Sequence, residues 1–432
     1  MNLKSFLFIP AMLSFLVATA QKGDYYQKDY FRYATHVYDT SIHSLDLHKK
    51  DFPLSMPLIN INDIKNKLVL SFDDFSDKVT DYRYKLIHCS ARWEPSEIRR
   101  PEYIRGFEDG YIENYRFSYN TIQPFIHYEL IFPREDMMPT VTGNYLIVVY
   151  PANQPGKPVL SARFKIFTKK VSISGNIKKA TSPRYMRSRQ EIDFTIRPRD
   201  IHIPTPSRDL KVIIQQNERK DNKLVDIKPL NITRNSFEYN YEDINLFEGG
   251  NEFRHFDMKS FKYQSEQVMK IDVSRGKNHV YLYPDKSRRY QEYTYDEDIN
   301  GKRLIKTTEY DDTDIEADYA WVHFKLPYEN PLIDGGIYIL GELTNWELNE
   351  KARMRYNYRK KVYEAKLYLK QGYYNYMYAF LKNGNDEASL KRIEGTHSDT
   401  ENHYTIYVYY RPPGGLYDKL IGMEGFSSAG NN

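Results

Sequence analysis

The stretch Tyr82-Arg-Tyr-Lys-Leu-Ile-His-Cys89 decides the fold of this chain. Its large side chains at Tyr82, Tyr84 and Leu86 alternate with charged ones, which is the period of a β-strand with one buried face. Short alternating runs of the same kind recur at 67–72, 126–132, 145–150, 163–167, 191–196, 210–214, 268–273, 320–326, 363–367 and 405–409. Helical patterns of ten or more residues are nearly absent. We therefore predict an all-β chain of tandem antiparallel β-sandwich (Ig-like) domains with few helices.

Shifts in composition predict the domain boundaries. One strand series ends near Phe167, an acidic run at 311–314 precedes another, and the sequence after Pro412 is rich in Gly, Ser and Asn. We expect a signal peptide at 1–20, an N-terminal β-sandwich at 21–168, a second β domain at 169–314, an Ig-like β-sandwich at 315–411 and a flexible tail at 412–432.

The first twenty residues are typical of a secretory signal. Lys4 supplies the charge, 6–17 the apolar region and 18–20 a small-residue cleavage site. The apolar run is shorter than the roughly 20 residues of a membrane-spanning helix, so we predict an exported mature chain. A lone cysteine excludes an intramolecular disulfide, and we expect Cys89 to be a buried structural thiol.

The composition argues against nucleic-acid binding and indicates a β-rich chain. The formal charge of +4 is the small difference between 62 basic and 58 acidic residues, without a long basic run. The 40 tyrosines suit strands, where a half-buried ring packs and its hydroxyl reaches water. They also suit a contact surface, which we weight lower.

Catalytic and metal-binding patterns are missing or incomplete. Asp296-x-Asp298-x-Asn300-Gly301 begins like a calcium loop, but Thr307 stands where the closing Glu belongs. Alternation at 290–295 makes Asn300-Gly301 a β-hairpin turn instead. The 11 histidines are scattered, and there is no nucleophile elbow. His88 and Cys89 are strand neighbours whose side chains diverge. We expect no enzyme activity, no metal and no cofactor.

A series of non-catalytic motifs, in the same order and spacing, resembles the plug protein of the type IX secretion system. The motifs are Phe72-Asp73, Cys89 with Trp93, Pro95 and Ser96, Glu102-Tyr103-Ile104-Arg105-Gly106-Phe107, Ser118 with Asn120 and Thr121, Thr142-Gly143-Asn144-Tyr145, Gly249 to Arg254 with Asp257, and Leu369 to Tyr376. The resemblance implies a non-enzymatic periplasmic protein, peripherally associated with the outer membrane. Its partner would be the very large outer-membrane β-barrel translocon, whose periplasmic opening it closes when no substrate moves.

The signature loops supply the candidate interface residues, which are Trp93, Pro95, Tyr103, Arg105, Phe107, Arg254 and Trp346. Trp93, Arg105 and Arg254 each have a structural alternative. We favour Trp93 as a residue that fills one end of the first sandwich over Trp93 as a surface anchor. Arg105 and Arg254 are expected to pin loops through carboxylates, for example Glu252 or Asp257.

The third domain is also similar to Ig-like glycogen- and starch-binding modules. The similarity lies in 338–346 followed by 369–376. It implies an alternative function, an exported carbohydrate-binding module in which Trp346 is one exposed aromatic platform. No second Trp follows in the loop at 382–385, and fold alone does not establish function.

Overall fold

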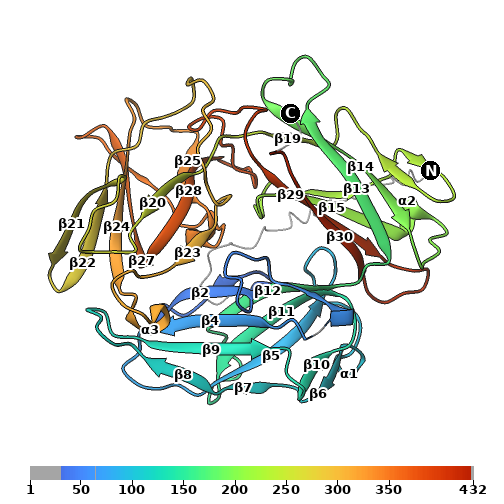
Figure 1. Ribbon diagram of the computed structural model, residues 1–432, viewed down its shortest axis with the longest axis horizontal. Coiled ribbons are helices and arrows are strands. Elements are labelled where there is room, and N and C mark those ends of the chain that lie inside the picture. The colour runs from blue at the N-terminus through green and yellow to red at the C-terminus, as the bar shows by residue number, and fades with distance from the viewer. Residues whose placement is uncertain (1–30, 64, 430–432) are drawn as a thin grey trace, which may run out of the picture. The chain divides into compact units, whose positions relative to one another are not determined.

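The prediction of an all-β fold is confirmed. The computed structural model describes residues 31–63 and 65–429, so the predicted signal peptide lies outside the described residues. In that part of the chain the helices are single turns: α1 (Arg100–Tyr103), α2 (Pro206–Asp209) and α3 (Thr313–Glu316), with 3-10 turns η1 (Ile61–Asp63) and η2 (Glu342–Thr344). None of the described helices has the length and apolar character needed to cross a membrane. The unit Arg32–Asn432 is compact and contains three β-sandwiches (Figure 1).

The first sandwich places two sheets face to face. One sheet has the order β1 (His36–Val37), β12 (Leu160–Phe167), β11 (Gly143–Pro151), β5 (Tyr82–Cys89) and β7 (Gly110–Ile112), with β3 (Leu58–Asn60) parallel to β12. The other has the order β2 (Ile42–Lys49), β4 (Leu68–Asp74), β9 (Ile126–Phe132) and β8 (Asn114–Phe117). The short strands β6 (Ile104–Gly106) and β10 (Met137–Pro139) pair separately.

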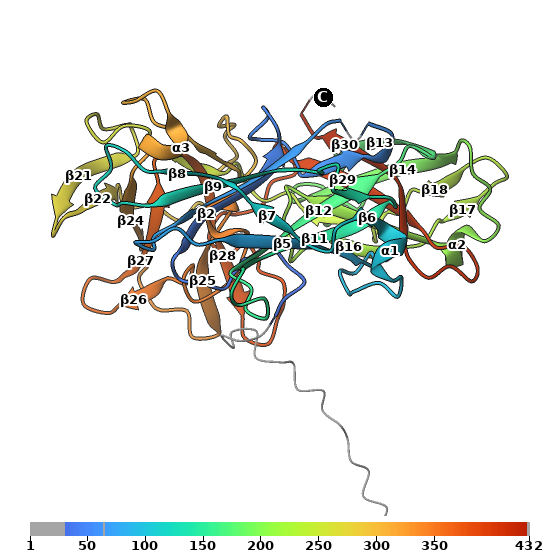
Figure 2. The ribbon, with the colours of Figure 1, turned by 90° about the horizontal axis from the view of Figure 1, so that it is seen from below.

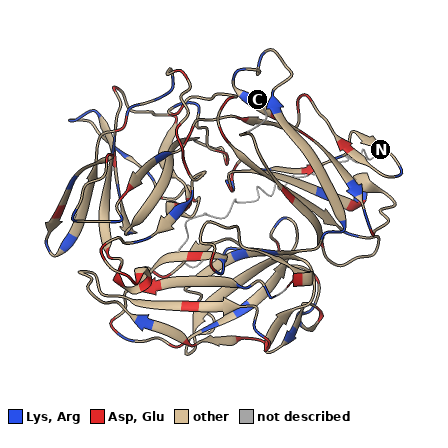
Figure 3. Ribbon diagram, in the orientation of Figure 1, with Lys and Arg blue, Asp and Glu red and all other residues tan. Residues whose placement is uncertain are grey.

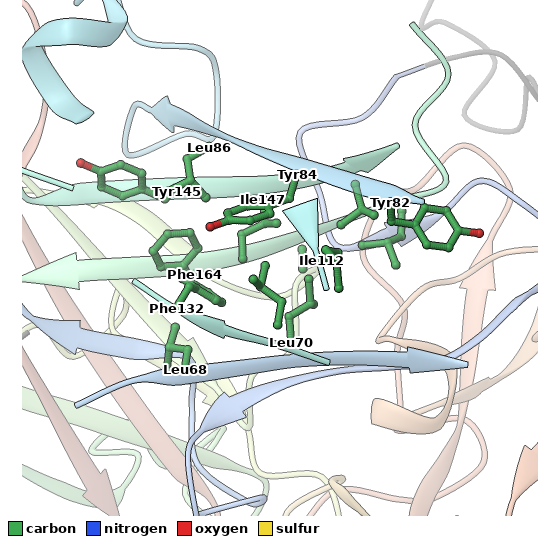
Figure 4. Close-up of a cluster of buried hydrophobic side chains, with 14 of the residues drawn as sticks. Leu68, Leu70, Tyr82, Tyr84, Leu86, Ile112, Phe132, Tyr145, Ile147 and Phe164 are labelled. Atoms are coloured by element: carbon green, nitrogen blue, oxygen red, sulfur yellow. The ribbon is translucent and has the colours of Figure 1, made fainter. Parts of the chain in front are cut away.

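Alternation in β5 produces the core of the first sandwich. Tyr82, Tyr84 and Leu86 are buried while Lys85 is exposed, as the period of two requires. Figure 4 shows these side chains facing those of the opposite sheet, including Leu68 and Leu70. Large apolar areas removed from water on both faces hold the two sheets together.

The second sandwich is built from two distant parts of the chain. One sheet has the order β13 (Val171–Lys179), β14 (Arg189–Pro198), β18 (Phe237–Tyr239) and β17 (Asn231–Ile232), with β19 (Leu246–Glu248) on β14. The other has the order β16 (Leu224–Ile227), β15 (Leu210–Gln216), β29 (His403–Tyr410) and β30 (Lys419–Ser427).

The prediction of a flexible tail is therefore wrong for 419–427. These residues form β30, in which Leu420 and Ile421 are buried. The Pro- and Gly-rich segment that indicated disorder is the turn between β29 and β30, where the N–H of Gly415 donates to the carbonyl of Pro412.

The third sandwich begins earlier than the predicted boundary at 314. One sheet has the order β20 (Arg254–Asp257), β28 (Gly372–Lys382) and β23 (Arg303–Ile305), with β25 (Gly335–Leu340) on β28. The other has the order β21 (Val268–Ser274), β22 (Lys277–Leu282), β24 (Tyr319–Pro327), β27 (Val362–Lys370) and β26 (Arg355–Asn357). Three strands before residue 314 thus pair with strands after it: β20 and β23 with β28, and β22 with β24.

The acidic run at 311–314 is a contact segment rather than a linker. It leads into α3, which lies against β9 of the first sandwich (Figures 1 and 2). Arg116 on β8 donates to Asp312 and, over 2.7 Å, to Asp314. Figure 3 shows the acidic residues gathered at this helix.

Candidate functional site

A cavity of about 150 Å³ lies where the three sandwiches meet. The first sandwich contributes β2, β12 and the loop after β5, and the second contributes β15, β29 and the loop between β15 and β16. The third contributes β23, η2 and the segment after η2. Its charged and aromatic lining side chains are Asp46, Trp93, Arg163, Phe164, Lys165, Glu218, Lys220, Lys223, Arg303, Glu342, Trp346, Tyr407 and Tyr409.

Trp93 forms one wall of this cavity. The loop after β5 is tightened by Ser90, whose carbonyl accepts the N–H of Trp93 at 2.9 Å, and Trp93 has a left-handed φ of 66°. Its ring is only 8% exposed and is covered by two cations of β12, with Arg163 at 4.3 Å and Lys165 at 5.4 Å from the ring centroid. Trp93 is therefore a buried residue at the junction of the sandwiches, stabilised by cation–π contacts.

The ammonium groups at the cavity are unusually easy to deprotonate. Burial, helped by the positive charge of Arg163, lowers the pKa of Lys165 to about 7. Burial likewise lowers the pKa of Lys220 and of Lys223 to about 8. Removing a charge from water disfavours the charged form of an amine, and neighbouring cations add to the effect.

The acidic side of the cavity has its own basic partners. Burial raises the pKa of Glu342 to about 7, and the charge of Asp46 acts in the same direction. The backbone N–H of Arg303 donates to Glu342 at 2.8 Å. The ammonium of Lys302 lies 2.8 Å from a carboxylate oxygen of Glu218. Positive and negative groups thus both line this small space.

Sequence reasoning missed the lysines of this cavity. Lys165 lies in an alternating strand, at a position that normally faces water, and Lys220 and Lys223 lie in a polar loop. Nothing in their local sequence indicates that the other sandwiches cover them. The signal that did point here was the pair Trp93 and Trp346, which both line the cavity.

Trp346 does not form an exposed carbohydrate platform. Asn345 and Trp346 both have left-handed backbone, with φ of 52° and 57°, and the ring packs edge-on against Phe253. Gly301 allows this approach, because a Cβ at that position would lie 2.4 Å from the indole. The side chain is 8% exposed, so the platform hypothesis for Trp346 is wrong. The similarity of the third domain to glycogen-binding modules stays a prediction.

Arg254 pins two loops, with partners other than those expected. Its guanidinium donates to Glu394 over 2.9–3.2 Å and to Asp285 over 2.9 Å, rather than to Glu252 or Asp257. Burial raises the pKa of Glu394, but Arg254 and Arg288 outweigh it and lower that pKa to about 2. The site is a charge-assisted network inside the third sandwich.

The remaining signature residues divide between core and surface. Tyr103 is buried in the core of the first sandwich, while Pro95, Arg105 and Phe107 are exposed. Burial raises the pKa of the Cys89 thiol to about 12, so this cysteine is the buried thiol that the sequence predicted.

The hairpin predicted around Asn300-Gly301 is absent. Both residues form a left-handed turn, with φ of 53° and 79°, but 290–295 is not a strand and β23 pairs with β28 instead. A carboxylate oxygen of Asp298 accepts the N–H of Phe253 and the other accepts that of Asn300, each at 2.5 Å. Among the described residues, no group of three His, Cys, Asp or Glu side chains is placed to hold a metal ion.

Exposed aromatic rings gather at one edge of the first sandwich. β7 and β8 are consecutive in the chain, and each is the outermost strand of its sheet. Four rings there are between 43% and 65% exposed, and we call them the aromatic edge: Tyr111, Tyr115, Phe117 and Tyr119. Sheet edges and exposed apolar groups both favour association with a partner.

The fold is that of a multi-sandwich β protein with a cavity between its sandwiches and an exposed aromatic edge. Residues 42–168 match the family described as type 9 secretion system plug protein, first domain. A crystal structure of a hypothetical protein from Parabacteroides merdae ATCC 43184 is 35% identical, with a TM-score of 0.89 over 92% of this chain and 100% of that chain. The chain belongs to the type 9 secretion system plug protein family.

Two further comparisons carry no functional argument. The BSP domain of a biofilm associated protein aligns at 10% identity with a TM-score of 0.16, over 90% of this chain and 59% of that chain. No curated protein matches this chain. Family membership gives the protein a role in type IX secretion and an association with the secretion machinery of the cell envelope, in a family of secretion plugs rather than enzymes.

Proposed function

We propose that this protein is a non-enzymatic periplasmic plug. It binds the periplasmic opening of the large outer-membrane β-barrel translocon of the type IX secretion system and seals that opening when the translocon is idle. Family membership supports this proposal. The observation that carries it is that three sandwiches form one compact unit, Arg32–Asn432, joined by buried polar contacts.

The contact between the first and third sandwiches is centred on Asp73. This carboxylate is fully buried and accepts hydrogen bonds from the ammonium of Lys370 and the hydroxyl of Tyr319, both at 2.6 Å. His127 lies 2.6 Å from its other oxygen. Burial raises the pKa of Asp73, but the charge of Lys370 and the contact with His127 outweigh it and hold that pKa below its usual value.

The contact between the first and second sandwiches is also buried and polar. The hydroxyl of Tyr409 on β29 donates to Asn144 on β11 at 2.7 Å. The backbone N–H of Ala91 donates to Asp418 at 2.9 Å, just before β30. Directional bonds inside an interface fix the relative position of the sandwiches, because leaving any of these groups unpaired is costly.

A rigid body suits a steric seal. A barrel wide enough for folded proteins leaks small molecules unless a solid body covers it, and sandwiches that moved independently would leave gaps. We place the contact with the barrel at the aromatic edge, because Tyr and Phe rings supply large contact area at a modest entropic cost. Binding must be reversible, so that substrate or partner subunits displace the plug.

The first test is affinity purification of the full-length protein with a C-terminal tag from mild-detergent extracts. We expect a stoichiometric outer-membrane β-barrel of very large size, identified by mass spectrometry. Cells that lack the protein should admit large antibiotics more readily than wild-type cells. Recovery of the protein alone, or with glycan-uptake components, together with equal antibiotic entry, would refute the plug function.

A second test addresses the aromatic edge. The double variant Phe117→Ser with Tyr119→Ser should lose most of the co-purified barrel while keeping the melting temperature, because both rings are exposed. The matched control is Tyr263→Ser with Tyr358→Ser, which removes two exposed rings of the third sandwich. Equal barrel recovery with both double variants would place the contact elsewhere.

A further inference from the structure

Two lysines at the central cavity have no anionic partner. Within 31–63 and 65–429, no hydrogen-bond acceptor or carboxylate lies within bonding distance of the ammonium of Lys165 or of Lys223. Lys165 instead lies over two rings, 4.2 Å from the centroid of Tyr407 and 5.4 Å from that of Trp93. The acidic groups of the cavity, Asp46, Glu218 and Glu342, are each engaged by other partners, with Asp46 accepting the N–H of Leu47.

An ammonium group in this cavity without an acceptor destabilises the folded protein, and a bound anion offsets that loss of stability. The rings of Trp93 and Tyr407 offset part of the lost hydration of Lys165, but a cation–π contact supplies no oxygen acceptor. Burial and the positive charge of Arg163 lower the pKa of Lys165 to about 7, and a bound anion would act against both. A ligand with several anionic oxygens would satisfy donors that the protein itself leaves open.

The positions of the cations indicate the shape of that ligand. Lys165 lies on β12 of the first sandwich, whereas Lys220 and Lys223 belong to the loop between β15 and β16 of the second. The ammonium of Lys220 already donates to the carbonyl of Asn345 at 2.6 Å, which anchors that loop to the third sandwich. Oxygens that point in several directions serve donors on separate elements better than a flat carboxylate does.

The cavity is large enough for a small ligand. Its volume of about 150 Å³ leaves room for several water molecules. A phosphate or sulfate group fits with a few waters or with a small attached residue.

We propose that this cavity is a binding site for a tetrahedral oxyanion, a phosphate or sulfate group held between Lys165 of the first sandwich and Lys223 of the second. The charged groups that face it are Arg163 and Lys165 from β12, Glu218, Lys220 and Lys223 from the loop after β15, Asp46 from β2, Arg303 from β23 and Glu342 from η2. The bound anion ties the first and second sandwiches together. This proposal does not depend on binding to the translocon.

Isothermal titration calorimetry with the full mature chain tests the site. The ligands are inorganic phosphate, sulfate, glucose 6-phosphate and acetate at pH 7 and low ionic strength. We expect one saturable site for phosphate and sulfate and weaker binding of acetate. Tighter binding of glucose 6-phosphate than of phosphate identifies an ester as the ligand, and the reverse order identifies the free ion. Absence of saturable binding by all the oxyanions overturns the proposal.

Variants locate the binding. Lys165→Gln and Lys223→Gln should each weaken phosphate binding about tenfold or more, the effect of losing one charge-assisted hydrogen bond. The control Lys270→Gln removes an exposed lysine of β21, far from the cavity lining, and should leave binding unchanged. Phosphate should raise the melting temperature of the wild type and not that of either cavity variant. Unchanged affinity in both cavity variants, with normal melting, refutes the assignment.

Discussion

Lys370 and Lys165 both lie at junctions between sandwiches, but only the ammonium group of Lys370 has hydrogen-bond acceptors among the described residues. Lys370 lies between the first and third sandwiches, 2% exposed, and is bonded to Asp73 at 2.6 Å and to the carbonyl of Asp314 at 2.7 Å. Lys165 lies at the junction with the second sandwich and faces only the rings of Trp93 and Tyr407. The contact around Lys370 pairs the ammonium group with acceptors of the protein, whereas the contact around Lys165 leaves the ammonium group without an acceptor in the described part of the chain. The molecule thus has one closed interface and one that is open to a ligand.

The largest effect is expected from breaking the closed interface. Lys370→Met leaves the carboxylate of Asp73 buried without its cation, so the free energy of unfolding should fall by about 3–5 kcal/mol. Urea denaturation measures the change. Asp73→Asn combined with Lys370→Met should recover much of the loss, because no uncompensated charge remains. A loss below about 1 kcal/mol for Lys370→Met would show that the buried carboxylate of Asp73 does not need the charge of Lys370.

The buried pair of Arg254 and Glu394 gives the next largest effect, as a dependence on pH. The pKa of Glu394 is about 2 in the folded protein, below its ordinary value, so the unfolded chain binds more protons as acid is added. Stability is fully present above pH 4.5 and falls by about 3 kcal/mol as the pH approaches 2. Denaturation at several pH values should show this fall in the wild type and a smaller one in Glu394→Gln.

Lys165 should show a dependence of the same sign at neutral to alkaline pH, with a smaller effect. Its folded pKa of about 7 lies below that of an unfolded lysine, so between pH 7 and about 10 the unfolded chain holds more protons. Stability from this group therefore rises with pH; solvent around this partly exposed side chain reduces the rise from the roughly 5 kcal/mol of the full shift to about 2 kcal/mol. Lys165→Met should flatten that rise and unfold at a higher urea concentration at pH 7. An unchanged pH profile in Lys165→Met would show that the ammonium is well compensated.

The smallest effect is expected at the exposed end of the closed interface. Arg116 bridges Asp312 and Asp314, but all three side chains are more than one third exposed. Exposed ion pairs contribute little, so Arg116→Ala should lower the free energy of unfolding by less than about 1 kcal/mol. High salt should reduce the wild-type advantage further. A loss as large as that of Lys370→Met would show that α3 is essential to the contact.

The sequence predicted the strands well because alternation is a local signal. Tyr82, Tyr84 and Leu86 alternate with polar residues, and the structure buries them. The series of motifs that includes those around Trp93 and Arg105 identified the family. The buried state of Cys89 also followed from its place at the end of an alternating run.

Local sequence patterns could not predict which distant strands pair with one another. β29 pairs with β15, almost two hundred residues earlier, and β30 follows a Pro- and Gly-rich turn whose composition resembles a disordered tail. The cavity was equally hidden, because Lys165 is an ordinary outward-facing strand residue until another sandwich covers it. The predicted partners of Arg254 were wrong for the same reason, because its actual partner Glu394 is distant in the sequence.

The last two strands, β29 and β30, belong to the second sandwich. This sandwich can therefore fold completely only when the whole chain has been made. During synthesis β13 to β19 emerge first, yet β15 lacks its neighbour β29 until residues 403–410 are available. The intervening third sandwich can fold in the meantime, since its strands all lie between 254 and 382. A prematurely terminated chain therefore keeps an open, apolar sheet that proteases and chaperones recognise. Only a chain that contains β29 can cover this sheet, so an incomplete molecule stays recognisable to the quality-control machinery of the cell.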